Sequence, residues 1–555
     1  MNKFALIIVS LTLLLLSNSS ALASNNHFGI HIFDESDLVD AANLVNSNGG
    51  EWGYVTLVIR EDERNTGRWQ RVFNEMRRLK LIPIVRIASK NEGGVWLKPT
   101  DDEAENWAMF LNSLNWPVKN RYIILFNEPN HAYEWGGQIN PQEYAKTARV
   151  YLEKLKEYSY DFFVMPAALD LAAPNGRETM DAAKFFAQMN SADEYLLSAF
   201  DGLASHSYPN PGFSGSTQDN GKMSIRGYQW ELDELSKYSF PENAPVFITE
   251  TGWLAGNKSE QEISQYFTHS FQNVWSDPRI MAITPFILNY NSKPFDDFSW
   301  KNPETGEFRE YYMAVQDMPK QKGAPEQIHA FETVDTGIAN QLITDSSYSF
   351  QFKIKNTGQS IWSTRDGFSF HFDTSLPHAN VDISPVPPTE PGQEANIPIR
   401  IFTEGVEGEQ KLTLAFNKNG KNIGKDIEIK FNVIAPPTLV FSANFLFSPD
   451  ADNVNLKITS ENLSWSFENI VVSKGAGGIS ALYNIIPGGE YLYELSRPGF
   501  IAKRVSRPLN KGVNNIDFGL LLPLDFNGDN QFNWHDILIY FANPVSLGLG
   551  LVSLR

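Results

Sequence analysis

The chain contains no cysteine, so disulfide bonds, thiol catalysis and cysteine-bound zinc are all excluded. Positive charge is also scarce, because 46 Lys and Arg face 65 Asp and Glu and leave a net charge of −19. Nucleic acids and anionic membranes attract basic surfaces, so neither is expected as a partner. The apolar stretch at 537–554 is interrupted by Asn543, Pro544, Gly548 and Gly550, and no membrane span is expected there.

The first 23 residues have the features of a secretory signal peptide. Lys3 precedes an apolar run over 5–16, and the Ala-Leu-Ala triplet at 21–23 offers the small residues that a cleavage site needs. The run is too short for an ordinary membrane-spanning helix, and no lipid-accepting cysteine follows it. We therefore expect residues 1–23 to be removed and the protein to be secreted or carried at the cell surface.

A chain of 555 residues exceeds what one hydrophobic core can hold, since single cores stop growing near about 250–300 residues. Residues 24–322 alternate short apolar runs with longer stretches of helical periodicity, as in Asn140–Tyr158. Eight such runs in about 290 residues predict a (β/α)8 TIM barrel. The expected strands are Phe28–Phe33, Tyr54–Arg60, Ile82–Ile87, Tyr122–Phe126, Phe162–Ala167, Leu203–His206, Val246–Thr249 and Ile280–Leu288. A doubly wound open sheet is the alternative, but no glycine-rich phosphate loop supports it.

The pattern changes after about Lys322, where short alternating runs replace the helices. Residues 323–435 are predicted to form one small all-β sandwich, and residues 436–522 a second, with Ala435-Pro436-Pro437 as the linker. Residues 523–555 form a short C-terminal segment with a calcium-loop pattern, described below.

Three motifs follow strands of the expected barrel. Asn127-Glu128-Pro129 comes after the fourth strand, His206-Ser207-Tyr208 ends the sixth, and Thr249-Glu250-Thr251-Gly252-Trp253 comes after the seventh. The carboxyl ends of the strands form the face on which barrel active sites lie. Glycoside cleavage needs one protonated and one ionised carboxyl group, at about 5–5.5 Å from each other in retaining enzymes. Because strands four and seven oppose each other across a barrel mouth, Glu128 and Glu250 are candidates for this pair.

The two glutamate motifs together resemble clan A of the glycoside hydrolases, and the resemblance extends over residues 27–318. It implies that Glu128 is the acid/base and Glu250 the nucleophile of a retaining, two-step hydrolysis of O-glycosidic bonds. It further implies that Asn127 binds the sugar 2-hydroxyl group, that His206 steers the acid/base and that the Tyr208 hydroxyl group holds Glu250. An arginine near the nucleophile is also usual in this clan. Arg86 is favoured over Arg60 because its strand assignment is cleaner.

One position departs from the clan pattern. Many members have a tryptophan at the end of the eighth strand, where this chain has Phe286. Two other tryptophans are candidates for sugar stacking, Trp135 on the aglycone side and Trp253 on the other side, although each can also be a packed loop aromatic.

The segment 525–536 has the spacing of a calcium loop. Side-chain oxygens fall at loop positions 1, 3, 5, 9 and 12, and the position-7 residue would contribute its backbone carbonyl group. The expected ligands are Asp525, Asn527, Asp529, Gln531, Asn533 and Asp536. An aspartate at position 12 resembles a dockerin repeat. Dockerins carry two repeats and this chain shows one, so a cohesin-type partner is not the favoured expectation.

The two β-sandwich segments show no catalytic pattern. The first resembles Ig-like accessory domains and the second resembles carboxypeptidase-regulatory-type sandwiches, so both are expected to act as spacers or weak sugar binders. The sequence thus predicts a secreted glycosidase with a carbohydrate substrate, no cofactor for catalysis and one Ca²⁺ at the C-terminal loop. A non-catalytic carbohydrate-binding or adhesion protein that keeps the barrel is the alternative. A metal-dependent hydrolase is disfavoured, because no His-x-His pair follows a strand.

Overall fold

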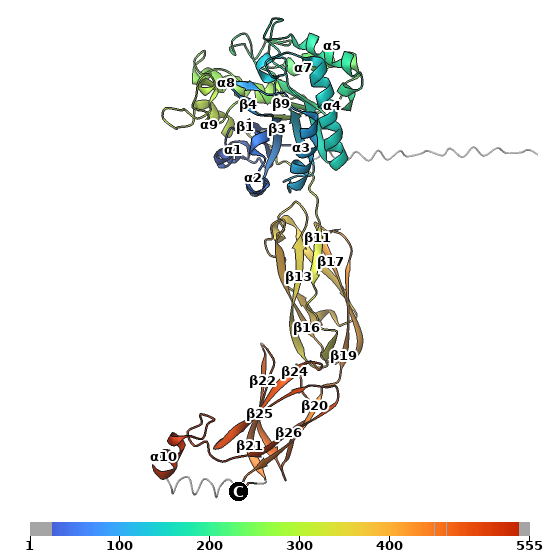
Figure 1. Cartoon of the computed structure of the whole chain (residues 1–555), viewed down its shortest axis with the longest axis vertical. Coiled ribbons are helices and arrows are strands. Elements are labelled where there is room, and N and C mark those ends of the chain that lie inside the picture. Colours follow the sequence, from blue (N-terminus) through green and yellow to red (C-terminus); the bar gives the residue numbers. More distant parts are fainter. Residues whose placement is uncertain (1–24, 449, 462, 543–555) are drawn as a thin grey trace, which may run out of the picture. The chain divides into compact units, whose positions relative to one another are not determined.

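The computed structural model describes residues 25–448, 450–461 and 463–542, so the expected signal peptide lies outside the described residues (Figure 1). The chain divides into two compact units. Unit 1 comprises residues 1–329 with 358–361, and unit 2 comprises residues 330–357 with 362–555. Among the described residues, no helix has the length and apolar character needed to cross a membrane.

Eight parallel strands form the centre of the described part of unit 1. They lie in two sheets, with the strand orders β1-β2-β3-β6-β7 and β10-β9-β8. Their bounds are β1 Gly29–His31, β2 Gly53–Arg60, β3 Leu81–Ala88, β6 Arg121–Leu125, β7 Phe162–Pro166, β8 Leu203–His206, β9 Val246–Glu250 and β10 Ile280–Ile283. Isolated parallel bridges link the sheets at both edges, between Phe28 and Ile283 and between Asp170 and His206.

Helices alternate with these strands along the chain. They are α1 Leu38–Val45, α2 Thr66–Arg78, α3 Asp101–Ser113, α4 Pro141–Tyr158, α5 Ala182–Ala192, α6 Leu196–Ala199, α7 Gly227–Leu235, α8 Glu260–His269 and α9 Glu310–Gln316. The sequence explains where α4 starts: Asn140 caps the backbone N–H of Glu143, and Pro141 occupies the first helical position, where no N–H is needed. Its buried face contains Tyr144, Tyr151 and Leu155, as the helical spacing predicts.

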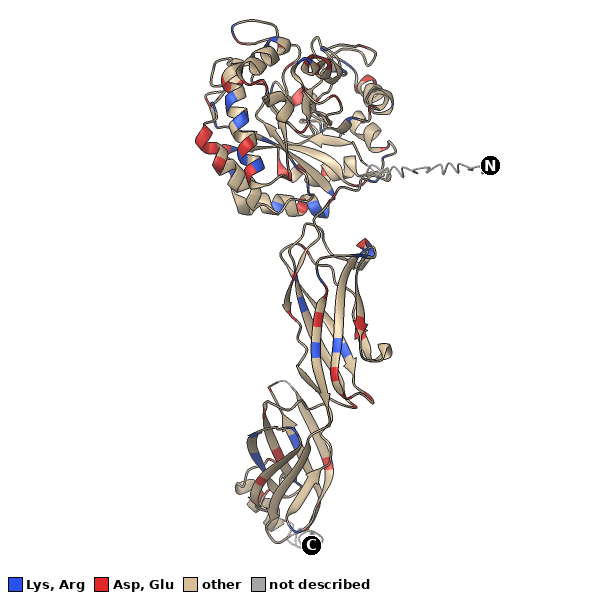
Figure 2. Cartoon of the chain, turned by 90° about the vertical axis from the view of Figure 1, so that its right-hand side faces the viewer, with Lys and Arg blue, Asp and Glu red and all other residues tan. Residues whose placement is uncertain are grey.

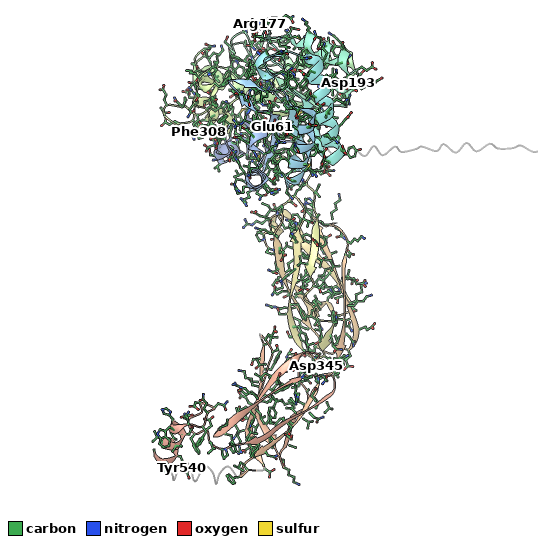
Figure 3. All side chains as sticks on the ribbon, in the orientation of Figure 1. Glu61, Arg177, Asp193, Phe308, Asp345 and Tyr540 are labelled. Carbon is green, nitrogen blue, oxygen red and sulfur yellow. The ribbon has the colours of Figure 1, made fainter. Side chains whose placement is uncertain are left out.

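The strands are buried on both faces. In β6, Tyr122 and Ile124 belong to an inner cluster that also contains Phe247 of β9, whereas Ile123 and Leu125 pack in the layer beneath the helices. Figure 2 shows charged residues mainly on the helices and loops around the strands, and Figure 3 shows the side chains of the described residues on the ribbon. This arrangement confirms the predicted α/β architecture with parallel strands.

Two local details of unit 1 differ from the sequence prediction. The eighth strand ends at Ile283 rather than Leu288, because Pro285 has no N–H group to donate to the sheet. A short hairpin, β4 Asn91–Glu92 and β5 Val95–Trp96, follows β3 and was not expected. It places Trp96 beside the loop after β6, where the backbone N–H of Gly136 donates to the Trp96 carbonyl group.

Unit 2 consists mainly of antiparallel β-structure, as the alternating pattern predicts, with two parallel pairings, β12 with β19 and β20 with β26. One pair of sheets has the orders β11-β13-β16-β15 and β12-β19-β17-β14, and a second pair has the orders β23-β20-β26 and β22-β21-β24-β25. Each pair has its own apolar core. The strands of the first pair are β11 Phe331–Asp335, β12 Gln341–Ile343, β13 Ser347–Asn356, β14 Phe368–Thr374, β15 Val381–Ile383, β16 Glu394–Phe402, β17 Gly408–Lys418, β18 Lys421–Asn422 (paired with β17) and β19 Ile427–Ile434. The strands of the second pair are β20 Thr438–Phe445, β21 Ala451–Thr459, β22 Ser464–Val472, β23 Ala476–Ile479, β24 Glu490–Arg497, β25 Phe500–Pro508 and β26 Val513–Leu521; helix α10 Trp534–Ala542 follows.

Candidate active site

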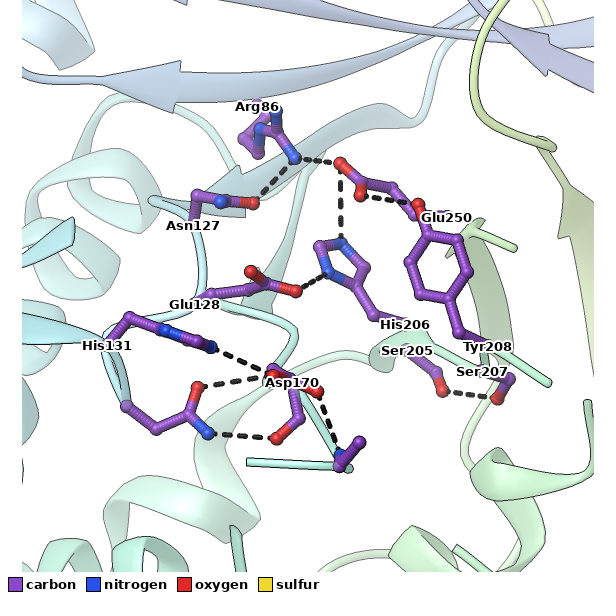
Figure 4. A network of polar contacts seen from close by, with 12 residues as sticks. Arg86, Asn127, Glu128, His131, Asp170, Ser205, His206, Ser207, Tyr208 and Glu250 are labelled. Carbon is purple, nitrogen blue, oxygen red and sulfur yellow. Dashed lines mark hydrogen bonds and ion pairs between the residues drawn. The ribbon is translucent and has the colours of Figure 1, made fainter. Parts of the chain in front are cut away.

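The three predicted motifs meet at one end of the parallel strands, together with Arg86 of β3. Glu250 is the last residue of β9, His206 is the last residue of β8, and Glu128 lies in the loop after β6. A cavity of about 770 Å³ opens there, and its walls include Arg86, Glu128 and Glu250. Figure 4 shows these side chains pointing toward one another from different strands.

Glu250 is buried and held on both carboxylate oxygens. Nη1 of Arg86 donates to its Oε1 at 2.5 Å, and the Tyr208 hydroxyl group donates to its Oε2 at 3.1 Å. Burial alone would raise the pKa of this carboxyl group. The neighbouring charges of His206 and Arg86 outweigh burial and lower the pKa of Glu250 from 4.5 to about 2. Glu250 is therefore ionised at neutral pH, as a nucleophile must be.

Glu128 is positioned through His206. Nδ1 of His206 lies 2.7 Å from Oε1 of Glu128, and Nε2 of the same ring lies 3.7 Å from Oε1 of Glu250. One oxygen of Glu128, one oxygen of Glu250 and one ring nitrogen of His206 all lie within 4.8 Å of one another. Burial lowers the pKa of His206, but the charges of Glu250 and Glu128 outweigh it and raise the pKa above its ordinary value.

The backbone around Glu128 is strained. Phe126 has a φ angle of 74° and Glu128 a φ angle of 27°, both in the left-handed region that non-glycine residues rarely adopt. Strain of this kind costs on the order of 1–3 kcal/mol per residue and is found preferentially at functional sites. Here it turns the chain sharply after β6, so that the Glu128 side chain reaches the cavity.

Asn127 and Arg86 are in direct contact. Nη1 of Arg86 donates to Oδ1 of Asn127 at 2.6 Å, and the amide nitrogen of Asn127 is left to donate to the carboxyl group of Glu134. Arg60 lines the same cavity but pairs with Asp62 and Glu63 instead of Glu250. The geometry therefore selects Arg86 as the arginine next to Glu250.

The structure contradicts the stacking role predicted for the two tryptophans. Trp253 is 2% exposed, packs edge-on against Phe267 and lies outside the cavity walls. Trp135 borders the cavity but is only 1% exposed, because its ring packs against Phe126 and Tyr144. Neither ring presents a free face to a sugar, so both residues stabilise loops from within.

Three polar residues of the cavity wall were not singled out from the sequence. Nε2 of His131 lies 2.9 Å from Oδ2 of Asp170, on the side of the cavity that carries Glu128. Glu134 lies six residues after Glu128, and burial together with the charge of Glu128 raises its pKa to about 8. Only their place in the loops after β6 and β7 could have pointed to them, because no short motif marks these residues.

Glu128, His206 and Glu250 are also the one group of His, Asp and Glu side chains, among the described residues, that is compact enough for a metal ion. Arg86 already supplies a cation at 2.5 Å from Glu250. An ion at this position would be repelled by the guanidinium group. The arrangement therefore suits acid/base and nucleophilic chemistry better than metal binding.

The C-terminal loop gathers some of its expected calcium ligands. The amide groups of Asn527 and Asn533 donate to Oδ2 of Asp529 at 2.8 and 2.9 Å. The carboxylates of Asp525 and Asp536 instead accept backbone N–H groups of the loop, among them those of Gly528 and Asn533. Gln531 donates its backbone N–H to Asp529. The oxygen-rich donor set fits Ca²⁺, although its acidic side chains do not converge on one point.

Residues 95–309 match the model of a protein family described as the glycosyl hydrolase catalytic core. No curated protein matches the chain. A GH5_18 protein from Bifidobacterium longum subsp. infantis is 11% identical with a TM-score of 0.38, over 59% of this chain and 83% of that one. A family 39 glycoside hydrolase from Bacteroides cellulosilyticus WH2 is 12% identical with a TM-score of 0.39, over 68% and 81%. At these values neither likeness bears on the activity. The segment that contains Glu128 and Glu250 thus matches a glycosyl hydrolase catalytic core.

Proposed function

We propose that the protein is a retaining glycoside hydrolase on a (β/α)8 barrel, with Glu250 as nucleophile and Glu128 as acid/base. The observation that carries this proposal is the pair of carboxylates within 4.8 Å of each other in one cavity, at the ends of β9 and after β6. Inverting enzymes keep their carboxyl groups about 6.5–9.5 Å apart, because a water molecule must fit between substrate and base. The spacing here leaves no such room and favours double displacement.

In the first step, an ionised oxygen of Glu250 attacks the anomeric carbon, and the bond from that carbon to the glycosidic oxygen breaks. Glu128 gives its proton to that oxygen, so the leaving group departs as a neutral alcohol. Arg86 and Tyr208 hold the two oxygens of Glu250 and thereby direct the attack. The amide group of Asn127 also hydrogen-bonds Glu134, and its second N–H would donate to a sugar hydroxyl group beside the anomeric carbon.

In the second step, the Glu128 carboxylate takes a proton from water, and the water oxygen attacks the anomeric carbon. The ester bond to Glu250 breaks, Glu250 regains its charge, and Glu128 is protonated for the next cycle. Two inversions at one carbon retain the configuration. His206 contacts Glu128 at 2.7 Å and faces Glu250 at 3.7 Å, which places an imidazole group between the two carboxyl groups throughout the cycle.

Reducing-sugar release from defined glucans, mannans, xylans and galactans tests the proposal, with the Glu250→Gln variant as the matched inactive control. The anomer formed first, followed by NMR, should have the configuration of the substrate. A protein that binds one of these glycans without hydrolysing it would instead support the carbohydrate-binding alternative. First formation of the opposite anomer would contradict the two-step mechanism.

Outside the catalytic unit, we propose that the chain is exported through residues 1–23 and that the two sandwiches of unit 2 act as spacers or weak sugar binders. We also propose one Ca²⁺ at the loop 525–536, held by the oxygen atoms of its Asp and Asn side chains and by the backbone carbonyl group of Gln531. The ion would neutralise three neighbouring acidic residues and would order the loop ahead of α10.

A further inference from the structure

A series of aromatic rings runs from the Glu250 end of the cavity toward its mouth. The ring of His31, whose Nδ1 lies 3.7 Å from Glu250, meets the ring of Phe286 edge-on at 5.1 Å between centroids. Phe286 meets Phe295 at 5.6 Å, and Phe295 meets Tyr290 at 6.1 Å. The series ends at Phe33, which meets Tyr290 at 5.1 Å. All five residues belong to the walls of the same cavity as Glu128 and Glu250.

The outer rings of this series are exposed to solvent and do not contribute to the hydrophobic core. Phe33 is 71% exposed and Phe295 is 45% exposed, although large apolar side chains seldom remain uncovered side by side without a function. By contrast, the tryptophans that were expected to bind sugar are fully packed. The outer rings therefore present apolar surface that the fold itself does not use.

The backbone holds these rings on two well-anchored loops. The backbone N–H of Leu288 donates to the carbonyl group of His31, which ties the segment after β10 to the end of β1. The backbone N–H of Tyr290 donates to Oγ of Ser299 at 3.0 Å, and the amide of Asn289 donates to Asp37 at 3.1 Å. A binding surface built on such anchored loops is preorganised, so little entropy is lost when a ligand covers it.

We propose that Phe33, Tyr290 and Phe295, here called the ring track, bind the sugar residues beyond the one attacked by Glu250. The occupant is a glycan chain, because the track continues the cavity that contains the two carboxylates. The C–H face of a pyranose ring can stack on an aromatic ring, while the carboxylate of Asp34, also in the cavity wall, can accept from sugar hydroxyl groups. The substrate is therefore a chain with more than one sugar on the nucleophile side of the cleaved bond.

The position of the track decides which side of the bond it serves. Its loops follow β1 and β10, and β10 pairs directly with β9, which carries Glu250. The acid/base side of the cavity is formed by other loops, with Tyr133 and the His131–Asp170 pair. The track thus lies on the glycone side, where residues of the chain remain attached to the enzyme after the first step.

This inference rests on the proposed glycosidase function, and its test separates the two. Wild-type protein, Phe33→Ala and Tyr290→Ala are compared on the 4-nitrophenyl monoglycoside and on oligosaccharides of two to six units of whichever glycan series is cleaved. Phe33→Ala should lower kcat/KM for the longer chains by about 3- to 10-fold, the value of one aromatic contact. It should leave kcat/KM for the monoglycoside unchanged, since that substrate does not reach the track. Phe33→Trp should restore kcat/KM for the longer chains to about the wild-type value.

Tyr160→Ala is the matched control, because Tyr160 is 90% exposed and precedes β7 at the opposite end of the strands. Tyr160→Ala should leave kcat/KM unchanged for both the monoglycoside and the oligosaccharides. Equal chain-length dependence in Phe33→Ala and wild type would overturn the track, as would an equal loss on the monoglycoside. Calorimetric binding of the same oligosaccharides to Glu250→Gln provides a readout without turnover. If the wild type cleaves none of the glycans but Phe33→Ala still weakens oligosaccharide binding, the hydrolase proposal fails and the ring track stands. If Phe33→Ala leaves the oligosaccharide affinity unchanged, the ring track is overturned.

Discussion

Nη1 of Arg86 lies 2.5 Å from Oε1 of Glu250, so a guanidinium group faces the proposed nucleophile inside the cavity. A charge-assisted hydrogen bond of this kind stabilises the ionised carboxylate and fixes its direction. The same guanidinium nitrogen also holds Asn127, so one side chain of β3 orders groups that arrive from β9 and from the loop after β6.

Arg86→Gln should lower kcat/KM by about 100-fold, because Glu250 loses the charge that orients it. The acidic limb of the pH profile should also move upward. Arg86 and His206 lower the pKa of Glu250 from 4.5 to about 2, so removal of one of these charges lets the carboxyl group stay protonated at higher pH. Arg60→Gln, in the same cavity wall but paired with Asp62 and Glu63, is the control and should remain within about twofold of wild type. Equal losses in both variants would argue against a specific role for Arg86.

Glu250→Ala should reduce turnover by more than about 1,000-fold, because no other group can form the covalent intermediate. Added azide should restore part of the activity and give a glycosyl azide of inverted configuration, since the small anion can enter the vacated space. Activity is followed by release of 4-nitrophenol, and the product by NMR. Circular dichroism should confirm that the variant, which leaves Arg86 without its carboxylate partner, remains folded. Undiminished turnover in a folded variant would refute the nucleophile assignment.

Glu128→Ala should separate substrates by their leaving groups. Aryl glycosides with acidic phenols need little protonation in the first step and should retain much of their first-step rate, whereas natural glycans should lose about 100- to 10,000-fold. A burst of phenol followed by slow turnover should appear, because the second step lacks its base. Pre-steady-state absorbance measurements would detect this burst. Equal losses for both substrate classes, with no burst, would be incompatible with an acid/base role.

Glu231 provides a test of stability against pH. It is fully buried on α7, and burial raises its pKa from 4.5 to about 8, while its Oε1 has no hydrogen-bond partner. In the unfolded chain this carboxyl group ionises near pH 4.5, so the folded state loses stability as the pH rises from about 4.5 to 8. Glu231→Gln removes this penalty and should stabilise the protein by about 2–4 kcal/mol at pH 8, with little effect at pH 4. Thermal unfolding followed by tryptophan fluorescence compares the stability of Glu231→Gln with that of wild type at pH 4 and at pH 8. An equal stability difference at the two pH values would show that Glu231 does not titrate in this range.

The calcium proposal is tested by titrating the full chain with Ca²⁺ in a calorimeter. One ion should bind with modest affinity, because only one loop is present and Asp525 and Asp536 must exchange backbone partners for the metal. The Asp529→Asn variant should bind more weakly, since it removes the charge on which Asn527 and Asn533 converge. Chelation should leave glycoside hydrolysis unchanged. Absence of any binding heat at millimolar Ca²⁺ would remove this site.

The strands and helices of unit 1 could be predicted from the sequence, because each depends on the hydrophobic pattern of a few neighbouring residues. Continuous apolar runs marked the parallel strands, and seven of the eight end within one or two residues of their predicted limits. The exception is β10, whose regular strand ends at Ile283, although the backbone N–H groups of Phe286 and Leu288 still donate to Thr251 and His31. The sugar-stacking roles of Trp135 and Trp253 failed for a different reason: whether an aromatic ring faces the core or a cavity depends on neighbours far away in the sequence, such as Phe267 for Trp253.

By itself, the sequence determined the order of strands and helices, the placement of both glutamates directly after strands, and the separation of an α/β segment from β-rich ones. These features follow from hydrophobic periodicity and from short motifs, which act over a few residues. The sequence favoured Arg86 over Arg60, but only the tertiary structure showed the contact of Arg86 with Glu250. Only the tertiary structure decided that His206 contacts Glu128 and faces Glu250, and that Phe33 joins Tyr290 and Phe295 in one track. Such contacts join residues from different strands and loops, so they depend on how the sheets bring the ends of their strands together.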